Sequence, residues 1–281
     1  MSSKNIVREQ VIPIGLTVIT FIGLVSLLYL TILFLNLLPL NQKIFLGIRK
    51  RDFLVGLTIY LKTGIDFAIF IGNLMHKNPG WKKRIAIELG TALGNGIGTI
   101  LVLVIWSFFK EIPALLIFMV IIASFVLLEM AEGSFNEFIE FNKNKTKIIG
   151  YIKTLKKPLN YINNFTSPVL GFFIPDLSLK DVKPLSFINL AVFSLSIPFV
   201  LGLDDFAGYI PLFSIINVFG FAIGVFAGHM LLNIGLFIFP KKTVGIVKNP
   251  IVLLFGGAVF IFIALFGFYE ALRLLQSIIL K

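Results

Sequence analysis

The sequence predicts an all-α polytopic membrane protein with about seven transmembrane helices. Of its residues, 57% are hydrophobic and only 14% are charged, and the mean hydropathy is +0.97. Soluble domains are typically about 45–50% apolar and about 25% charged. The apolar residues also form long continuous runs, whereas a soluble core needs them on one face of each element. The composition therefore excludes a soluble fold.

Seven segments are long enough to cross a bilayer as helices. A hydrocarbon core about 30 Å thick requires about 20 apolar residues, since a helix rises about 1.5 Å per residue. None of the segments shows the alternation that a membrane β-strand requires. The predicted spans are 12–38, 53–75, 86–109, 112–130, 186–210, 215–239 and 250–272.

The predicted N-terminal region, residues 1–51, holds the first span and a basic loop. Its apolar run exceeds the roughly 7–15 residues of a signal-peptide core, and no small-residue cleavage site follows it, so we expect a retained helix. Most Lys and Arg residues between spans fall on the side of the N-terminus, which predicts a cytoplasmic N-terminus in a multi-pass cell (inner) membrane protein. The basic cluster Arg49–Arg51 falls on the opposite side and leaves open whether the first segment spans fully.

Charge and cysteine content restrict the partners. The net charge is +11, but the basic residues lie between spans, where they can contact anionic lipid, and no nucleic-acid-binding motif accompanies them. The chain has no cysteine, which excludes disulfides, thiolate metal sites and thiol redox chemistry. We expect the partners to be the lipid bilayer and a small ion or solute, with no nucleic acid and no resident cofactor. Self-association into a homo-oligomer stays open.

Residues 131–185 form a basic loop between two groups of spans. Its part from Lys143 to Lys157 mixes basic and aliphatic residues, which suits a helix lying in the membrane interface. A solvated linker is the alternative. Prolines such as Pro158 and Pro168 are expected to break the rest into short pieces.

The two groups of spans, 52–130 and 186–281, resemble each other and predict a 3+3 repeat. Gly64-Ile65-Asp66-Phe67 resembles Gly202-Leu203-Asp204-Asp205-Phe206. An odd number of spans per copy makes the second copy inverted, as in many secondary transporters with a binding site near the membrane midplane. Two further matches follow in order: Gly90, Gly94 and Gly98 with Gly220, Gly224 and Gly228, then Ala123, Phe125 and Glu129 with Ala264, Phe266 and Glu270. We expect the two glycine ladders to form the central packing seam.

Charged residues inside the predicted spans mark the candidate site, because each costs about 2.5–3.5 kcal/mol on insertion scales. Lys62 and Asp66 are four residues apart and could simply neutralise each other on one helix face. Asp204 and Asp205 have no basic residue within a turn, so they need a cation or a proton unless they reach interfacial water. Pro198 interrupts the helix ahead of them.

Asn95 and His229 complete the predicted ion-binding set. Asn95 lies beside the first glycine ladder, and its amide is either a ligand or an interhelical hydrogen bond. His229 could bind a metal or relay a proton, or donate one hydrogen bond to a neighbouring helix. A metal site of Asp66, Asp204 and Asp205 is a hypothesis. We expect Glu88, at the start of the third span, to be an interfacial charge favoured by the helix dipole.

The two acidic motifs and the closing glycine-rich helix, Phe255-Gly256-Gly257-Ala258-Val259 through Leu265-Phe266-Gly267, resemble the lysine-exporter superfamily, in particular its cadmium-resistance and manganese-efflux branches. The resemblance covers residues 53–275; the extra first span and the long central loop depart from its six-span pattern. It implies export of a cation or a small amino compound, with the intramembrane acids at the substrate site.

The resulting hypothesis is a non-enzymatic transporter of a divalent metal cation or small cationic solute. Oxygen ligands without thiolate favour hard cations such as manganese, magnesium or calcium. One alternative is a membrane scaffold or assembly protein that transports nothing. Another is an intramembrane aspartyl hydrolase using Asp66 and Asp204, although the Gly-x-Gly-Asp context is missing at both.

Overall fold

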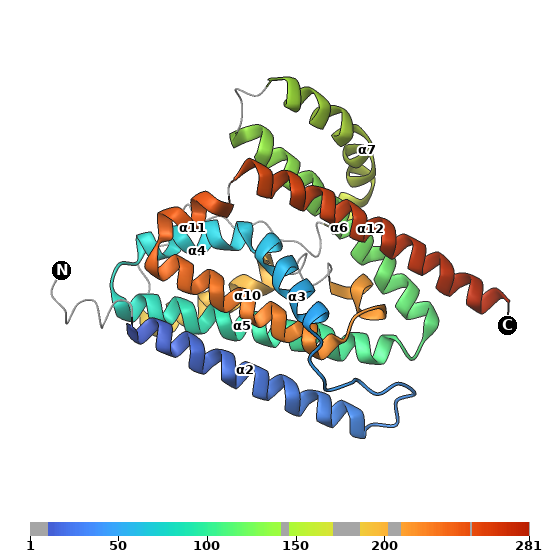
Figure 1. Ribbon diagram of the computed structural model, residues 1–281, viewed down its shortest axis with the longest axis horizontal. Helices are drawn as coiled ribbons and strands as arrows, with labels where there is room; N and C mark the ends of the chain where they lie inside the picture. The colour runs from blue at the N-terminus through green and yellow to red at the C-terminus, as the bar shows by residue number, and fades with distance from the viewer. Residues whose placement is uncertain (1–10, 142–145, 171–185, 202–208, 248, 281) are drawn as a thin grey trace. The chain divides into compact units, whose positions relative to one another are not determined.

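The computed structural model describes residues 11–141, 146–170, 186–201, 209–247 and 249–280 (Figure 1). Within these residues the secondary structure is helical. The elements, in order, are α2 (Ile12–Leu37), α3 (Lys50–Thr63), α4 (Ile65–Lys77), α5 (Trp81–Phe109), α6 (Pro113–Phe141), α7 (Thr146–Leu170), α8 (Phe187–Leu201), the 3-10 helix η2 (Ile210–Ser214), α10 (Val218–Ile238), α11 (Pro240–Val247) and α12 (Pro250–Ile279).

Five of the described helices, α2, α5, α6, α10 and α12, are long and apolar enough to cross a membrane. Their outward surfaces are also apolar. Phe34 on α2 is 62% exposed and Phe262 on α12 is 73% exposed. Water would not tolerate so many exposed large apolar side chains, whereas lipid does. The prediction of a helical membrane protein is therefore confirmed.

One predicted span differs from a single long helix. The segment 53–75 consists of α3, with 14 residues, and α4, with 13, and Figure 1 shows the chain changing direction between them. Each is shorter than the roughly 20 residues that a span requires. The segment 186–210 is described in part: α8 runs through Pro198 to Leu201, and residues 202–208 lie outside the described part of the chain. The predicted interruption at Pro198 is therefore wrong, because a helix can continue past a proline that lacks only one N–H donor. The total of seven spans stays a prediction.

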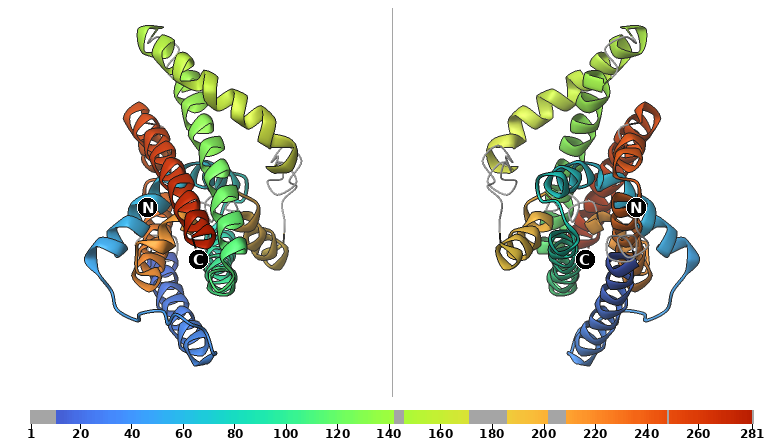
Figure 2. Two further views of the ribbon diagram at one scale, coloured as in Figure 1. Left: turned by 90° about the vertical axis from the view of Figure 1, so that its right-hand side faces the viewer. Right: turned by 90° about the vertical axis from the view of Figure 1, so that its left-hand side faces the viewer.

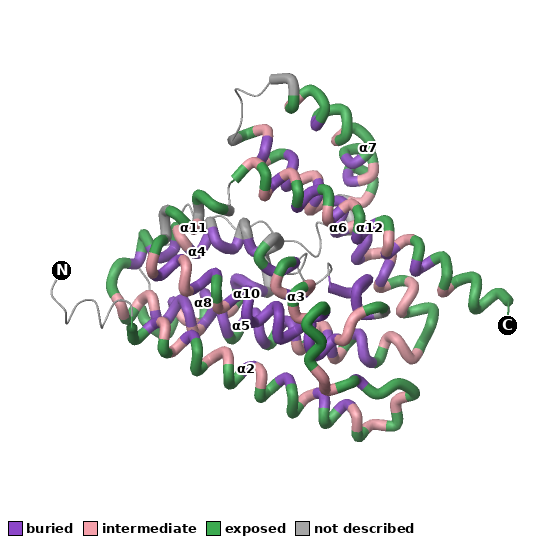
Figure 3. Tube along the Cα trace, viewed as in Figure 1, coloured by how far each residue is buried: buried purple, intermediate pink, exposed green. Residues whose placement is uncertain are grey.

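The helices form two compact units. One unit contains α2, α3, α4, α8, α10 and α5 as far as Val104. Its centre is α10, which is buried along most of its length (Figure 3). Helix α2 buries a stripe that includes Leu24, Leu28 and Ile32 and leaves its other side exposed. A stripe at three- and four-residue intervals is what one face of a helix presents to its neighbours.

The other unit contains α6, α7, η2 and α12. Helices α6 and α12 pack antiparallel, since Gly267 faces Ser124 and Gly257 faces Phe135. Helix α7 folds back along the end of α6 (Figure 2). Glu132 of α6 holds it by accepting a 2.5 Å hydrogen bond from Asn163 Nδ2 and by an ion pair at 3.5 Å with Lys156.

The central loop contains more regular structure than its prolines suggest. Pro158 and Pro168 lie inside α7, so the prediction that they break this segment into short pieces is wrong. Proline removes one N–H from a helix, but its fixed φ is helical, and the carbonyl left without a donor can be solvated on an exposed face. Most of α7 around Pro158 is exposed.

Candidate functional site

The candidate site begins at the interruption between α3 and α4. Helix α3 ends at Thr63, and Gly64 has φ −69° and ψ 13°. The Gly64 N–H donates to the Tyr60 carbonyl at 2.7 Å, and the Ala68 N–H donates to the Gly64 carbonyl at 2.9 Å. A Cβ at Gly64 would lie 2.9 Å from the Tyr60 carbonyl oxygen, which is tighter than side chains accept. Glycine therefore lets the two helices join closely at a changed direction.

A buried hydrogen-bonded triad lies beside this interruption. The hydroxyl of Tyr60 on α3 is 2.5 Å from Nδ1 of His229 on α10, and Nδ2 of Asn233 is 2.9 Å from His229 Nε2. The Phe67 ring, in the first turn of α4, lies 5.4 Å from the imidazole. All four side chains are buried. Residues from three helices thus meet around one titratable ring.

The triad accommodates either neutral tautomer of the imidazole. In the orientation described, the Asn233 amide donates to Nε2, which leaves Nδ1 to carry the proton toward the Tyr60 oxygen. Asn233 Oδ1 has no hydrogen-bond partner among the described residues. Turning that amide over would present an acceptor to a protonated Nε2, and the Tyr60 hydroxyl would then donate to Nδ1.

Glycines bring α3 and α10 into close contact around the triad. A Cβ at Gly224 would collide with the Phe53 carbonyl oxygen, and one at Gly228 would lie 2.9 Å from the Tyr60 ring and 3.3 Å from the Leu57 carbonyl oxygen. Residues further along α10 contact residues further along α3, so the two helices run parallel. Gly228 is the middle residue of the 21-residue α10. Helix α3 therefore ends alongside the middle of a candidate span.

Helices α5 and α8 form a second close contact of the same kind. A Cβ at Gly90 would collide with the Ala191 carbonyl oxygen, and one at Gly94 would collide with the Leu195 carbonyl oxygen and lie 3.0 Å from the Pro198 ring. These contacts also advance together, so α8 runs parallel to α5. The two predicted glycine ladders thus do not share one seam, as the sequence suggested, because each packs against a different short helix.

The α3–α10 and α8–α5 contacts use corresponding residues of the two short helices. On α3 they fall eleven, seven and four residues before Gly64, and on α8 they fall eleven, seven and four residues before Gly202 in the sequence. This contact register differs from the predicted alignment by one helical turn. It pairs Gly90 and Gly94 with Gly224 and Gly228, Asn95 with His229, and Thr99 with Asn233. The repeat itself stays a prediction.

Asn95 is buried, as its predicted role requires, and is the middle residue of the 29-residue α5. Among the described residues, its Nδ2 has no hydrogen-bond partner, and neither does the hydroxyl of Thr99 one turn later. The Ser194 hydroxyl on α8 is likewise buried without a partner in that part of the chain. Unused donors and acceptors in a buried position are costly, so they usually indicate water or a ligand that the protein alone does not supply.

The predicted acids are placed only in part. Asp66 is the second residue of α4, directly before Phe67. Lys62 belongs to α3, so the break at Gly64 lies between the two residues, and their pairing stays a prediction. The side chains of Lys62 and Asp66, and the whole of Asp204 and Asp205, lie outside the described residues. The predicted metal site therefore stays a hypothesis.

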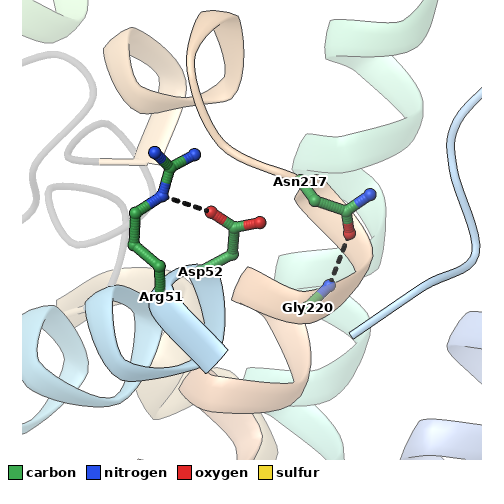
Figure 4. Close-up of polar contacts among 4 residues, drawn as sticks. All are labelled: Arg51, Asp52, Asn217 and Gly220. Atoms are coloured by element: carbon green, nitrogen blue, oxygen red, sulfur yellow. Dashed lines mark hydrogen bonds and ion pairs between the residues drawn. The ribbon is translucent and has the colours of Figure 1, made fainter. Parts of the chain in front are cut away.

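Asp52 is a buried acid that the sequence analysis missed. Its carboxylate lies in the first turn of α3, accepts from Arg51 Nε at 3.3 Å and has one oxygen without a partner. Figure 4 shows it close to the start of α10, where Asn217 Oδ1 accepts from the Gly220 N–H at 2.8 Å. The positive ends of two parallel helix dipoles favour a carboxylate here. An acid directly after a basic run is the sequence signal of such a helix start.

Among the described residues, no group of three or more His, Asp or Glu side chains could hold a metal ion. No family model, curated protein or solved structure matches the chain.

Proposed function

We propose that the chain is a secondary transporter that moves a small cation across the membrane through a site at its two helix interruptions. The observation that carries this proposal is the matched packing of the two short helices. Helix α3 ends directly before the motif glycine Gly64, and α8 is described as far as Leu201, next to Gly202 in the sequence. Each packs in parallel against a candidate span contributed by the other group of predicted spans. Paired interruptions in corresponding positions are the best indication of a transporter's binding site.

The directions of the helices support an inverted repeat. If the second copy is inverted, the first helix of one copy runs parallel to the second helix of the other, and the two third helices run antiparallel. Helix α3 is parallel to α10, α8 is parallel to α5, and α6 is antiparallel to α12. A repeat with uniform orientation would reverse each of these relations.

The depth of the two helix contacts supports a midplane site. Gly64 contacts Leu232, one turn beyond the middle of α10, and Pro198 contacts Gly94, beside the middle of α5. The end of α3 at this depth leaves backbone carbonyls and N–H groups available to a ligand. Asp66 follows this end directly in the sequence, and Asp204 and Asp205 follow the described part of α8.

The residue types favour a hard cation. Carboxylate, amide and hydroxyl oxygens suit manganese, magnesium or calcium, and a small cationic solute would use the same carboxylates. Lys62 would compensate the acids when the cation leaves. Rocking of one copy against the other would expose the site alternately to each side, as in other inverted-repeat transporters.

The test is cation flux into proteoliposomes containing the full chain, with Mn²⁺, Mg²⁺ and Ca²⁺ as probes. We expect the double variant Asp204→Asn/Asp205→Asn and the variant Asp66→Asn to lose about tenfold or more of the flux, because a charge-assisted contact is worth about 1.5–3 kcal/mol. Glu140→Gln, at the exposed end of α6, is the matched control and should transport normally. Unchanged flux in the double variant would remove the proposal.

A further inference from the structure

Glu88 is a buried acid outside both interruptions. It lies in the third turn of α5, which begins at Trp81, and its side chain is 1% exposed. Helix α2 covers it, and Thr17 of α2 is its hydrogen-bond partner. Its second oxygen has no partner. The expectation of an interfacial charge at the start of the span is therefore wrong, because the helix begins two turns earlier and another helix packs over the carboxyl.

The surroundings of Glu88 favour a neutral carboxyl. Helix α2 has no charged side chain from Ile12 to Leu37, and α8, which packs at Gly90, has none from Phe187 to Leu201. Arg84 is one turn earlier on α5, and no ion pair joins it to Glu88 within the described residues. An ionised carboxylate here would be an unpaired charge in an apolar environment, which is costly enough that such groups usually hold a proton.

The hydrogen bonds around Thr17 show how that proton fits. The Thr17 hydroxyl lies within hydrogen-bonding distance of Glu88 Oε1 and also 3.0 Å from the Pro13 carbonyl oxygen, but it carries one proton. A protonated Glu88 donates to the Thr17 oxygen while Thr17 donates to Pro13, and both contacts are satisfied. An ionised Glu88 takes the Thr17 proton away from Pro13.

A polar stripe leads from Glu88 to the middle of the span. Thr91, Asn95 and Thr99 follow Glu88 at positions three, seven and eleven, on the same side of α5, and all are buried. Asn95 Nδ2 and the Thr99 hydroxyl have no partner within the residues that the structure describes, so both can bind water or a proton carrier. In the register given by the packing, Ala222 is the residue of α10 equivalent to Glu88, so this acid belongs to one half only.

We propose that Glu88 is the proton-binding group that couples proton movement to cation transport, an inference that rests on the proposed function. In the conformation described, Glu88 holds the proton and donates to Thr17. When α2 and α5 separate enough to admit water, the carboxyl releases its proton to water on one side, and it takes a proton from the other side after the cation has moved. One proton is thus exchanged against the cation in each cycle.

The experiment compares wild type with Glu88→Gln in proteoliposomes. A pH gradient should drive Mn²⁺ uptake by wild type, and Glu88→Gln should lose at least about 90% of this uptake, a tenfold or larger effect. Exchange of labelled Mn²⁺ across the membrane without a gradient should persist in Glu88→Gln, because exchange carries the cation in both directions and needs no return step with a proton on Glu88. Thr17→Val should weaken the coupling, and Thr17→Ser, which restores the hydroxyl, should recover it.

An infrared spectrum of the full chain gives a readout that does not depend on transport. The C=O stretch of a protonated carboxylic acid should be present near neutral pH in wild type and be reduced in Glu88→Gln. Gradient-driven uptake retained by Glu88→Gln, loss of exchange together with uptake in a folded Glu88→Gln protein, or an unchanged infrared band would each overturn the coupling role. Absence of both uptake and exchange in wild type would instead remove the proposed function itself, leaving the infrared band as the test of Glu88.

Discussion

The Tyr60 hydroxyl and His229 Nδ1 are 2.5 Å apart, although 169 residues separate them in the sequence. The contact joins the last turn of α3 to the middle of α10, next to the interruption at Gly64. It fixes the depth at which α3 ends. The position of the candidate site therefore depends on this pair and on the glycines that let the two helices approach.

Tyr60→Phe should destabilise the protein while leaving the fold intact. The change removes the hydroxyl and leaves a buried imidazole nitrogen without its partner, which costs about 1–3 kcal/mol. Thermal unfolding in detergent measures the loss. Tyr161→Phe on α7, where the side chain is 80% exposed, is the control and should leave the unfolding temperature unchanged. Equal unfolding temperatures for the two variants would contradict a buried Tyr60–His229 bond.

Gly94→Ala and Gly224→Ala should have similar, large effects. In each case the new methyl group would collide with a backbone carbonyl oxygen of the facing helix, Leu195 or Phe53, and backbone cannot move as a flexible side chain does. Overpacking of this kind costs about 1–3 kcal/mol. Gly23→Ala on α2 is the control, since nothing lies within 4 Å of its Cβ position. Because Ala favours a helix more than Gly does, Gly23→Ala should be neutral or slightly stabilising. A destabilisation at Gly23 as large as the other two would contradict packing as the cause.

The absence of cysteine from the sequence allows both close contacts to be cross-linked directly. A Cβ at Gly90 lies 2.7 Å from the Ser194 Cβ, and one at Gly228 lies 3.1 Å from the Tyr60 Cβ. Disulfides have Cβ separations near 3.5–4.5 Å, so the helices of each pair must move apart slightly. At Gly90 the same movement relieves the collision of the new Cβ with the Ala191 carbonyl oxygen. We expect Gly90→Cys/Ser194→Cys and Gly228→Cys/Tyr60→Cys to oxidise rapidly, as followed by gel mobility after proteolysis.

The control for the cross-links is Gly90→Cys/Ser196→Cys, because Ser196 is exposed and two residues along α8 from the contact. It should stay reduced under the same conditions. If it oxidises as fast as the Gly90→Cys/Ser194→Cys pair, α8 does not pack against α5 through Ser194.

Glu132→Ala should release α7 from α6. The carboxylate receives Asn163 and Lys156 from α7, and removal leaves both without this partner. Limited proteolysis of the full chain should cut within α7 several-fold faster than in wild type, because local opening exposes its backbone. In the control variant Glu140→Ala, at the exposed end of α6, the protease should cleave α7 at the wild-type rate. Equal rates in the two variants would mean that other contacts hold α7.

The membrane class and the positions of the long helices were predictable from the sequence, because hydropathy over about 20 residues reports a span without knowledge of its neighbours. The sequence showed Gly64 in an acidic motif just ahead of Asp66, but not that the segment divides there into two helices of half-span length. That outcome depends on tertiary contact with Leu232 and Tyr60, which local sequence does not encode.

The site was predictable only where polarity alone identified it. His229 and Asn95 were recognised because polar residues are rare in apolar helices, whereas Tyr60 and Asn233 look like ordinary helix residues until α3 and α10 are brought together. Glu88 was misplaced because the start of α5 was set by hydropathy, which cannot detect a polar first turn. The sequence could not show that the contacts pair Gly90 with Gly224 and not with Gly220, because glycines at every fourth position fit both alignments.

Reactivity of introduced cysteines tests the midplane site most directly. Asp66→Cys should react with a membrane-impermeant thiol reagent added to either side, because the site opens alternately to each. Lys43→Cys, in an exposed loop, should react from one side only, and Phe262→Cys, on the lipid-facing side of α12, from neither. An Asp66→Cys protein that reacts from one side as rapidly as Lys43→Cys, or that does not react at all, would contradict the account.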